Sequence, residues 1–182
     1  MGVSAEWRIM MDNEKRTNVE NPLACRNVGE LTVRKNLPPS DALSDLTCRQ
    51  LIQEAMNSLK YAYAPYSNFM VGAALLTTKK TIYTGCNIEN SAYSPTICAE
   101  RTAFAKAVSE GARDFAAIAI VGGKGGIPMD YCPPCGVCRQ VMMEFCDPKK
   151  FVVILARSED DYWVYSLQDL LPMGFSPKNV AD

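Results

Sequence analysis

The sequence predicts an α/β fold in which helices cover the faces of a mixed β-sheet. Segments with helical spacing of apolar residues and segments with strand patterns follow one another in the order α-β-β-α-β-α-β-β-α. The chain has 182 residues, of which 48% are hydrophobic and 21% charged. This length and composition are typical of one globular domain with a core of ordinary size.

The first predicted helix follows Ser44, a candidate N-cap for which Thr47 is a competitor. Its apolar residues recur at spacings of three and four: Cys48, Ile52, Ala55, Met56 and Leu59. This stripe predicts that one helix face is buried, and Pro65 is expected to end the helix.

A β-hairpin is expected next, with strands over residues 69–77 and 81–87 joined by a turn at Lys79-Lys80. A helix is then predicted over residues 95–111, because Gly111 supplies a C-terminal stop. The remaining segments, in chain order, are a buried strand over 115–121, a glycine-rich loop over 122–134, a helix over 135–146, a buried strand over 151–156, an edge strand over 162–165 and a capped helix over 166–171.

The first 40 residues show no regular periodicity and end at Pro38-Pro39, so we expect a partly disordered N-terminal extension before a domain over residues 41–182. Trp7 is the one residue of the extension that suggests docking. Neither a secretory signal nor a transmembrane segment is recognised, which predicts a cytoplasmic protein, with nuclear entry left open. The net charge of −1 and the pI near 5.6 argue against a nucleic acid polymer as partner.

The chain contains no histidine, which excludes a Ser-His-Asp triad, a Cys-His pair and an imidazole metal ligand. It contains eight cysteines, and clustered cysteines in a reducing compartment suggest a metal. Cys135 and Cys138 form a CxxC at the start of a predicted helix. By itself this motif fits zinc binding, redox exchange or coincidence.

A second motif, Cys98-Ala99-Glu100, narrows these alternatives because a cysteine stands two residues before a carboxylate. Together with Pro134 before Cys135, it resembles the signature of zinc nucleobase deaminases. Three thiolates leave a tetrahedral zinc one open position, as in catalytic sites. Glu100 is placed to accept a proton from water there, and Arg101 and two helix N-termini can offset the thiolate charge.

Cys132 allows two further interpretations of the cysteine site. Cys132, Cys135 and Cys138 resemble part of an iron–sulfur motif, although the expected fourth position is Met142, and Cys132 could alternatively close the zinc site. The other cysteines are most simply free thiols, with two of them on presumed core faces: Cys25, Cys48, Cys86 and Cys146.

From residue 45 to about residue 178 the chain resembles the cytidine deaminases of the small homotetrameric type, which bind zinc with three cysteines. Five ordered motifs carry the resemblance: Tyr63-Ala64-Pro65-Tyr66-Ser67-x-Phe69-x-Val71-Gly72-Ala73-Ala74, Gly85-Cys86-Asn87-Ile88-Glu89-Asn90, Cys98-Ala99-Glu100-Arg101-Thr102-Ala103, Pro134-Cys135-Gly136-x-Cys138-Arg139-Gln140-Val141 and Leu170-Leu171-Pro172-x-x-Phe175.

The resemblance implies a three-layer α-β-α fold with a mixed five-stranded sheet, and hydrolytic deamination of cytidine and 2′-deoxycytidine in pyrimidine salvage. It implies one zinc ion per chain on Cys98, Cys135 and Cys138, with Glu100 shuttling protons and Arg101 neutralising the thiolates.

For substrate binding, the resemblance implies that Phe69 stacks on the base, that Asn87 and Glu89 bind the ribose hydroxyls, and that Ala99 belongs to the site. Tyr93 and Phe175 would reach a neighbouring subunit's pocket, so that a homotetramer shares its active sites.

Three alternatives remain: a non-catalytic zinc or iron–sulfur binding module, a deaminase of another modified pyrimidine nucleoside or nucleotide, and a deaminase of single-stranded nucleic acid. Glu100 argues against the binding module, because such a module has no use for a carboxylate beside its ligand. The chain departs from the family's compact members in its N-terminal extension, in the longer loop over residues 122–131 and in Pro133.

Overall fold

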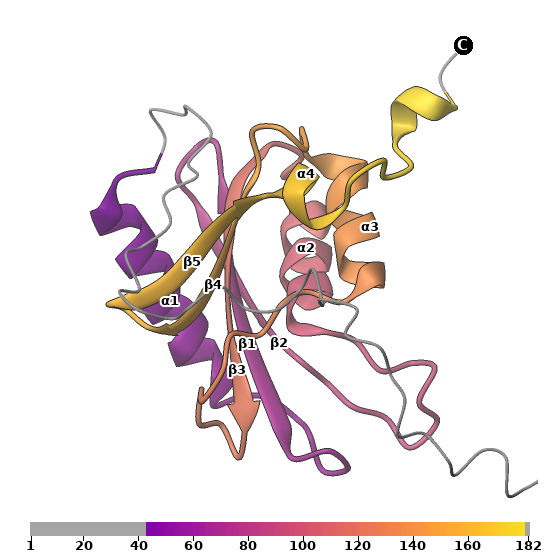
Figure 1. Cartoon of the computed structure of the whole chain (residues 1–182). Coiled ribbons are helices and arrows are strands. Elements are labelled where there is room, and N and C mark those ends of the chain that lie inside the picture. Colours follow the sequence, from indigo (N-terminus) through magenta and orange to yellow (C-terminus); the bar gives the residue numbers. More distant parts are fainter. Residues whose placement is uncertain (1–42, 181–182) are drawn as a thin grey trace, which may run out of the picture. The chain divides into compact units, whose positions relative to one another are not determined.

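The computed structural model describes residues 43–180 and confirms the α/β fold (Figure 1). The predicted N-terminal extension, with Trp7 and Cys25, lies outside the described residues. The helices are α1 Asp45–Leu59, α2 Ala99–Ser109, α3 Gly136–Phe145, α4 Leu167–Leu170 and the short 3-10 helix η2 Pro177–Asn179. The strands are β1 Phe69–Thr77, β2 Ile82–Cys86, β3 Phe115–Lys124, β4 Val152–Ser158 and β5 Asp161–Ser166.

The five strands form one mixed sheet in the order β2-β1-β3-β4-β5. Strands β3 and β4 are parallel, and the other neighbouring pairs are antiparallel. A parallel pair needs a crossover connection, and α3 supplies it between β3 and β4. Helix α1 covers one face of the sheet, and α2 and α3 cover the other, which gives three layers (Figure 1).

The two core layers follow from the alternation of side chains along the central strands. Leu75 of β1 and Ile118 of β3 face α2 and α3, whereas their neighbours Ala74 and Ala119 face α1. All four side chains are fully buried, as a central strand between two helical layers requires.

Two predicted helix caps are confirmed. The Ser44 hydroxyl accepts a hydrogen bond from the Thr47 amide, so Ser44 and not Thr47 caps α1. Ser166 and Asp169 form a reciprocal capping box at α4. Position 162–165 is confirmed as an edge strand, since β5 is the last strand of the sheet.

Several predicted boundaries are wrong. Helix α1 ends at Leu59, well before Pro65. Helix α2 begins at Ala99 rather than at residue 95, because the backbones of Ile97 and Ile88 pair at 2.9 and 3.0 Å and keep this stretch extended. Strand β3 continues past residue 121 to Lys124, since its last residues pair with the start of β1.

Smaller corrections concern the ends of four other elements. Strand β2 is shorter than residues 81–87, β4 and β5 are longer than residues 151–156 and 162–165, and α3 excludes both Cys135 and Cys146, which cap it. Within the described residues, no helix is long and apolar enough to cross a membrane.

Candidate metal and active site

Three cysteines meet where the N-termini of α2 and α3 converge. Cys98 is the N-cap of α2, Cys135 is the N-cap of α3, and Cys138 lies in the first turn of α3. Gly85 of β2 permits the close approach of α2, because a Cβ at Gly85 would lie 2.4 Å from the Ala99 carbonyl oxygen. The N-terminal turn of α2 is thereby fixed directly on the sheet.

The sulfur positions fit a zinc ion. The Cys98 and Cys135 sulfurs are 3.8 Å apart, and those of Cys135 and Cys138 are 3.5 Å apart. All three lie within 4.8 Å of one another. Sulfurs bonded to zinc at about 2.3 Å with tetrahedral angles lie about 3.8 Å apart, so these residues could hold the ion with little movement.

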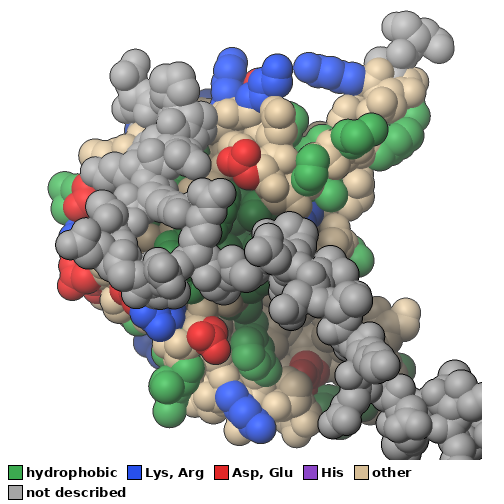
Figure 2. Space-filling view, in the orientation of Figure 1, with side chains coloured by type: hydrophobic (Ala, Val, Ile, Leu, Met, Phe, Trp, Pro, Cys, Tyr) green, Lys and Arg blue, Asp and Glu red, His purple; other side chains and the backbone are tan. Residues whose placement is uncertain are grey.

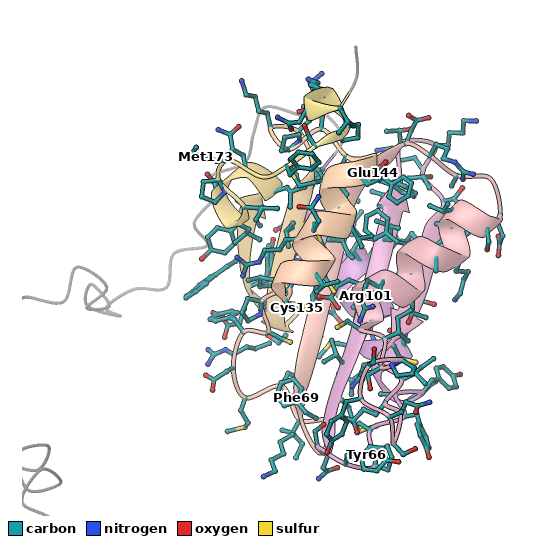
Figure 3. The ribbon with its side chains drawn as sticks, turned by 90° about the vertical axis from the view of Figure 1, so that its right-hand side faces the viewer. Tyr66, Phe69, Arg101, Cys135, Glu144 and Met173 are labelled. Carbon is teal, nitrogen blue, oxygen red and sulfur yellow. The ribbon has the colours of Figure 1, made fainter. Side chains whose placement is uncertain are left out.

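Arg101 lies beside the Cys98 sulfur of this group. Its guanidinium donates to the Thr96 carbonyl at 2.9 Å and lies 3.6 Å from the Cys98 sulfur. The pKa of the Cys98 thiol is lowered to about 5, by hydrogen bonding with Cys138 first and with Arg101 next, although burial opposes the shift. The site therefore favours a thiolate even before a cation binds. Figure 3 shows Arg101 and Cys135 next to each other.

Glu100 is the only charged side chain that is buried among the described residues, with 5% of its surface exposed. Burial raises the pKa of its carboxyl to about 7, and the nearby Cys98 thiolate adds to this shift. A carboxyl group whose pKa lies near neutrality can both accept and release a proton during one reaction cycle.

Cys132 is not part of the metal-ligand group of the described residues, which consists of Cys98, Cys135 and Cys138. Its thiol packs against Gly122 of β3, where an added Cβ would lie 3.0 Å from the sulfur. Burial raises the pKa of this thiol to about 12, and the charges of Glu100 and Cys98 add to the effect. The cysteines of the described residues form no disulfide, and Cys48 and Cys146 are buried as predicted.

The Asn87 side chain is bonded to strand β1. Its Oδ1 accepts a hydrogen bond from the Val71 amide at 2.8 Å, and its Nδ2 donates to the Phe69 carbonyl at 2.8 Å. Phe69 is 41% exposed at the start of β1, and it lies below Cys135 in the view of Figure 3. Asn87 therefore fixes the strand end that presents Phe69, and each amide atom keeps capacity for one more hydrogen bond.

Glu89 is held by a neighbouring loop. Its carboxylate accepts hydrogen bonds from the Ser67 hydroxyl at 2.6 Å and from the amides of Tyr66 and Ser67 at 2.9 and 3.2 Å. These bonds, with Ser67 the largest contributor, lower the pKa of the Glu89 carboxyl. Glu89 is thus an ionised, oriented acceptor close to Asn87 in the chain.

Three other predicted substrate-binding residues differ in their exposure. The side chain of Ala99 is fully buried, so only its backbone is available to a ligand. Tyr93 is 76% exposed and packs edge-on against Tyr66, with ring centroids 6.3 Å apart. Phe175 is 60% exposed, and its carbonyl accepts a hydrogen bond from Gln140 of α3.

Sequence reasoning did not identify the support roles of Ser67 and Arg139. Ser67 bonds Glu89 and also accepts a hydrogen bond from the Phe69 amide at 2.9 Å. Arg139 donates to the carbonyl of Pro134 at 2.8 Å and to that of Leu170 at 2.6 Å. Both residues stand inside motifs that carry the family resemblance, which was the available signal.

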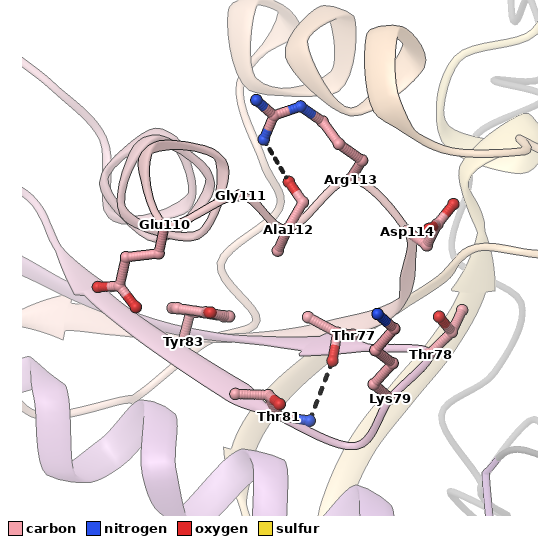
Figure 4. Close-up of a pocket in the computed structure, with 10 residues that line it drawn as sticks. All are labelled: Thr77, Thr78, Lys79, Thr81, Tyr83, Glu110, Gly111, Ala112, Arg113 and Asp114. Atoms are coloured by element: carbon pink, nitrogen blue, oxygen red, sulfur yellow. Dashed lines mark hydrogen bonds between the residues drawn. The ribbon is translucent and has the colours of Figure 1, made fainter.

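A polar pocket of about 390 Å³ lies at the opposite end of α2 from Cys98 (Figure 4). Lys79, Glu110 and Asp114 contribute charges of both signs, and the Arg113 guanidinium is bonded to the Ala112 carbonyl at 2.8 Å. Because its charges are mixed, the pocket indicates no ligand class and is distinct from the cysteine group.

The α-β-α fold and the meeting of C-x-E with P-C-x-x-C define the class of zinc-binding nucleobase deaminases. The family model described as "Cytidine and deoxycytidylate deaminase zinc-binding region" matches residues 47–155. The chain belongs to this family of cytidine and deoxycytidylate deaminases.

Individual proteins and solved structures that resemble the chain are also cytidine deaminases. The chain is 50% identical over 132 residues to a cytidine deaminase of Sporosarcina psychrophila, covering 72% of this chain and 93% of that one. It is 44% identical over 129 residues to a probable cytidine deaminase of Dictyostelium discoideum, covering 71% of this chain and 84% of that one. The crystal structure of cytidine deaminase from Burkholderia pseudomallei superposes with a TM-score of 0.64 at 46% identity, covering 69% of this chain and 97% of that one.

Replacement of Asn87 by alanine is expected to lower the free energy of unfolding by about 1–3 kcal/mol, because a β1 amide and a β1 carbonyl lose their partner. Urea denaturation measures this change. Asn90→Ala, which removes one bond to the Ala92 amide in an exposed loop, is the control and should cost less. Equal effects would contradict a special role of Asn87 in holding β1.

Proposed function

We propose that the protein hydrolyses cytidine and 2′-deoxycytidine to uridine and 2′-deoxyuridine, releasing ammonia, as an enzyme of pyrimidine salvage. The observation that carries this proposal is the buried Glu100 carboxyl, which stands beside three cysteine sulfurs spaced for zinc. Cys98, Cys135 and Cys138 would hold a zinc ion, which would supply Lewis acidity and make water a better nucleophile toward an electron-poor carbon.

Glu100 performs the proton transfers in this proposal. Water adds to C4 of the pyrimidine, which requires removal of a proton from water and protonation of ring N3. The C4 hydroxyl then gives up its proton and becomes the carbonyl of uridine, while the amino group gains a proton and leaves as ammonia. A single carboxyl with a pKa raised to about 7 can carry each proton in turn, since its two protonation states are similar in energy.

The surrounding side chains orient the substrate. The exposed ring of Phe69 is suited to stack on a flat base, and Asn87 and Glu89 supply acceptors and a donor to ribose hydroxyls. Arg101 limits the negative charge of the three thiolates. The buried Ala99 would contribute through its backbone alone.

A second candidate substrate is deoxycytidylate, because the description of the matching family model includes it. The ionised Glu89 disfavours a phosphorylated sugar, since a carboxylate close to the ribose repels phosphate. We therefore place free nucleosides first.

Purified protein tests both candidates by the loss of cytidine absorbance, with metal analysis of the same sample. We expect turnover of cytidine and deoxycytidine, little turnover of deoxycytidylate, and one zinc ion per chain. Zinc without turnover of either nucleoside would overturn the substrate assignment and direct attention to modified or phosphorylated pyrimidines. Iron in place of zinc would return Cys132 to consideration as a ligand.

We further propose a homotetramer whose active sites are shared between subunits. The support is the exposure of aromatic side chains that the domain does not bury, including Tyr93 and Phe175. Phe175 is 60% exposed, and Figure 2 shows hydrophobic side chains near the C-terminal segment to which it belongs.

Replacement of Phe175 by alanine is expected to raise KM at least several-fold while changing the melting temperature little, because the side chain would act in a neighbouring subunit's pocket. Met173→Ala is the matched control, since this fully exposed side chain lies in the same segment. Steady-state kinetics and thermal melting are measured together. A lower melting temperature without a kinetic change would assign Phe175 to its own subunit's packing.

A further inference from the structure

Four side chains form a cluster on the β4–β5 side of the sheet. Tyr131, from the loop after β3, stacks on Trp163 of β5 with ring centroids 4.1 Å apart and an interplanar angle of 21°. The Arg157 guanidinium lies 5.0 Å from the centroid of the Tyr131 ring. The Tyr131 hydroxyl donates to the Asp161 carboxylate, which also pairs with Arg157 at 2.7 Å. We call these four residues the Tyr131 clamp.

The clamp uses three kinds of interaction on one ring. Stacked aromatic pairs and cation–π contacts both stabilise a ring beyond the burial of its apolar surface. Burial and the Asp161 carboxylate raise the pKa of Tyr131 to about 12, so the hydroxyl stays a donor at neutral pH. The loop is therefore anchored at Tyr131 by contacts that depend on the tyrosine ring.

The segment that follows Tyr131 leads directly to the candidate metal site. Cys132 comes next, and its thiol packs beside Gly122 and within the electrostatic influence of Glu100 and Cys98. Two prolines then precede the ligand Cys135. Prolines fix φ and restrict the residue before them, so the segment cannot easily absorb a displacement at one end.

The far end of this segment is also fixed. The Pro134 carbonyl accepts a hydrogen bond from Arg139 at 2.8 Å, and Arg139 also bonds the Leu170 carbonyl. The four residues 131–134 thus run as a stiff strap between the clamp and α3. Cys132, between Tyr131 and the two prolines, packs against Gly122 and against the core cluster that includes Ala99 and Cys138.

We propose that Tyr131 is a positioning residue, whose stack on Trp163 holds the strap 131–134 on the core and sets the place of Cys135 in the zinc site. This inference rests on the proposed function for its kinetic consequence. Its consequence for metal retention does not depend on the substrate, because Cys135 holds zinc whichever pyrimidine is used. Residues that orient metal ligands typically contribute 10- to 100-fold to metal affinity or activity.

The test compares zinc-loaded Tyr131→Leu with the wild-type protein. Leucine preserves apolar burial but removes the stack, the cation–π contact and the hydroxyl. We expect zinc transfer to a chromogenic chelator to become about 10- to 100-fold faster and kcat for cytidine to fall by a similar factor. Tyr131→Phe keeps the ring and should stay within a few-fold of the wild type in both measurements.

Two more variants keep the proposal falsifiable. Trp163→Leu breaks the same stack from β5 and should reproduce the effects of Tyr131→Leu, even if the latter folds poorly. Met129→Ala removes an exposed side chain from the same loop and should leave zinc release and kcat unchanged. If both leucine variants release zinc at the wild-type rate and only melt earlier, the clamp is structural and the proposal is wrong. The zinc-release rates can be compared even if the wild-type protein does not deaminate cytidine.

Discussion

Glu100→Ala is expected to abolish cytidine turnover while one zinc ion per chain remains bound. The carboxyl is buried beside the cysteine group and is not one of its ligands, so its loss removes the proton shuttle without removing a metal bond. General acid–base catalysis typically contributes about 10²- to 10⁴-fold, and a group that makes every transfer should lie at the upper end. Turnover by cytidine absorbance and zinc by metal analysis are measured on the same preparation.

Two control variants make this result specific. Glu110→Ala removes an exposed glutamate just past the other end of the same helix, and it should keep both turnover and zinc. Glu100→Gln preserves the shape of the side chain but cannot accept a proton, so it should be as inactive as the alanine variant. Loss of zinc from Glu100→Ala would contradict the assignment, because it would make the carboxylate part of the metal site.

The sequence predicted the candidate site best where two of its residues lie within one turn of the same helix. Cys98 and Glu100 are close because both belong to the start of α2, and Cys135 and Cys138 are close because both belong to the start of α3. Spacing alone therefore predicted each pair. That the two pairs meet depends on the packing of α2 and α3 on the sheet, which the family resemblance supplied.

Contacts between distant segments could not be predicted in this way. The sequence identifies Asn87 as a polar residue after a strand, but its bonds to Phe69 and Val71 depend on the register of β1. The stack of Tyr131 on Trp163 likewise depends on the path of a loop across β5. The spacing of apolar residues predicts which face of a helix or strand is buried. It contains no information about which loop residue packs on that face.

The wrong start of α2 has a similar cause. Pro95 is compatible with a first helical turn, and the residues after it have no strong strand pattern. In the structure, Ile97 pairs with Ile88 by two backbone hydrogen bonds, and this tertiary contact overrides the local preference. The later start of α2 matters for the candidate metal site, because it makes Cys98 the N-cap and places its sulfur at the end of the helix.

Cys138→Ala is expected to lose both zinc and turnover. Two thiolates cannot replace three in a site with this geometry, and catalytic zinc sites normally use three protein ligands. Cys138 is also buried in the core, so part of any stability change would come from lost packing. Cys138→Ser therefore accompanies the alanine variant, since it preserves the volume and removes only the strong metal ligand.

Two other cysteines provide the comparison that decides whether Cys138 acts as a ligand. Cys146→Ala truncates a buried thiol at the end of the same helix, outside the ligand group, and should retain one zinc per chain. Cys132→Ser should also retain zinc, because its sulfur is not among the three that converge. If Cys132→Ser lost the metal as completely as Cys138→Ser, the ion would have four thiolate ligands and no open position. Such a site would be structural, and water could not be activated there.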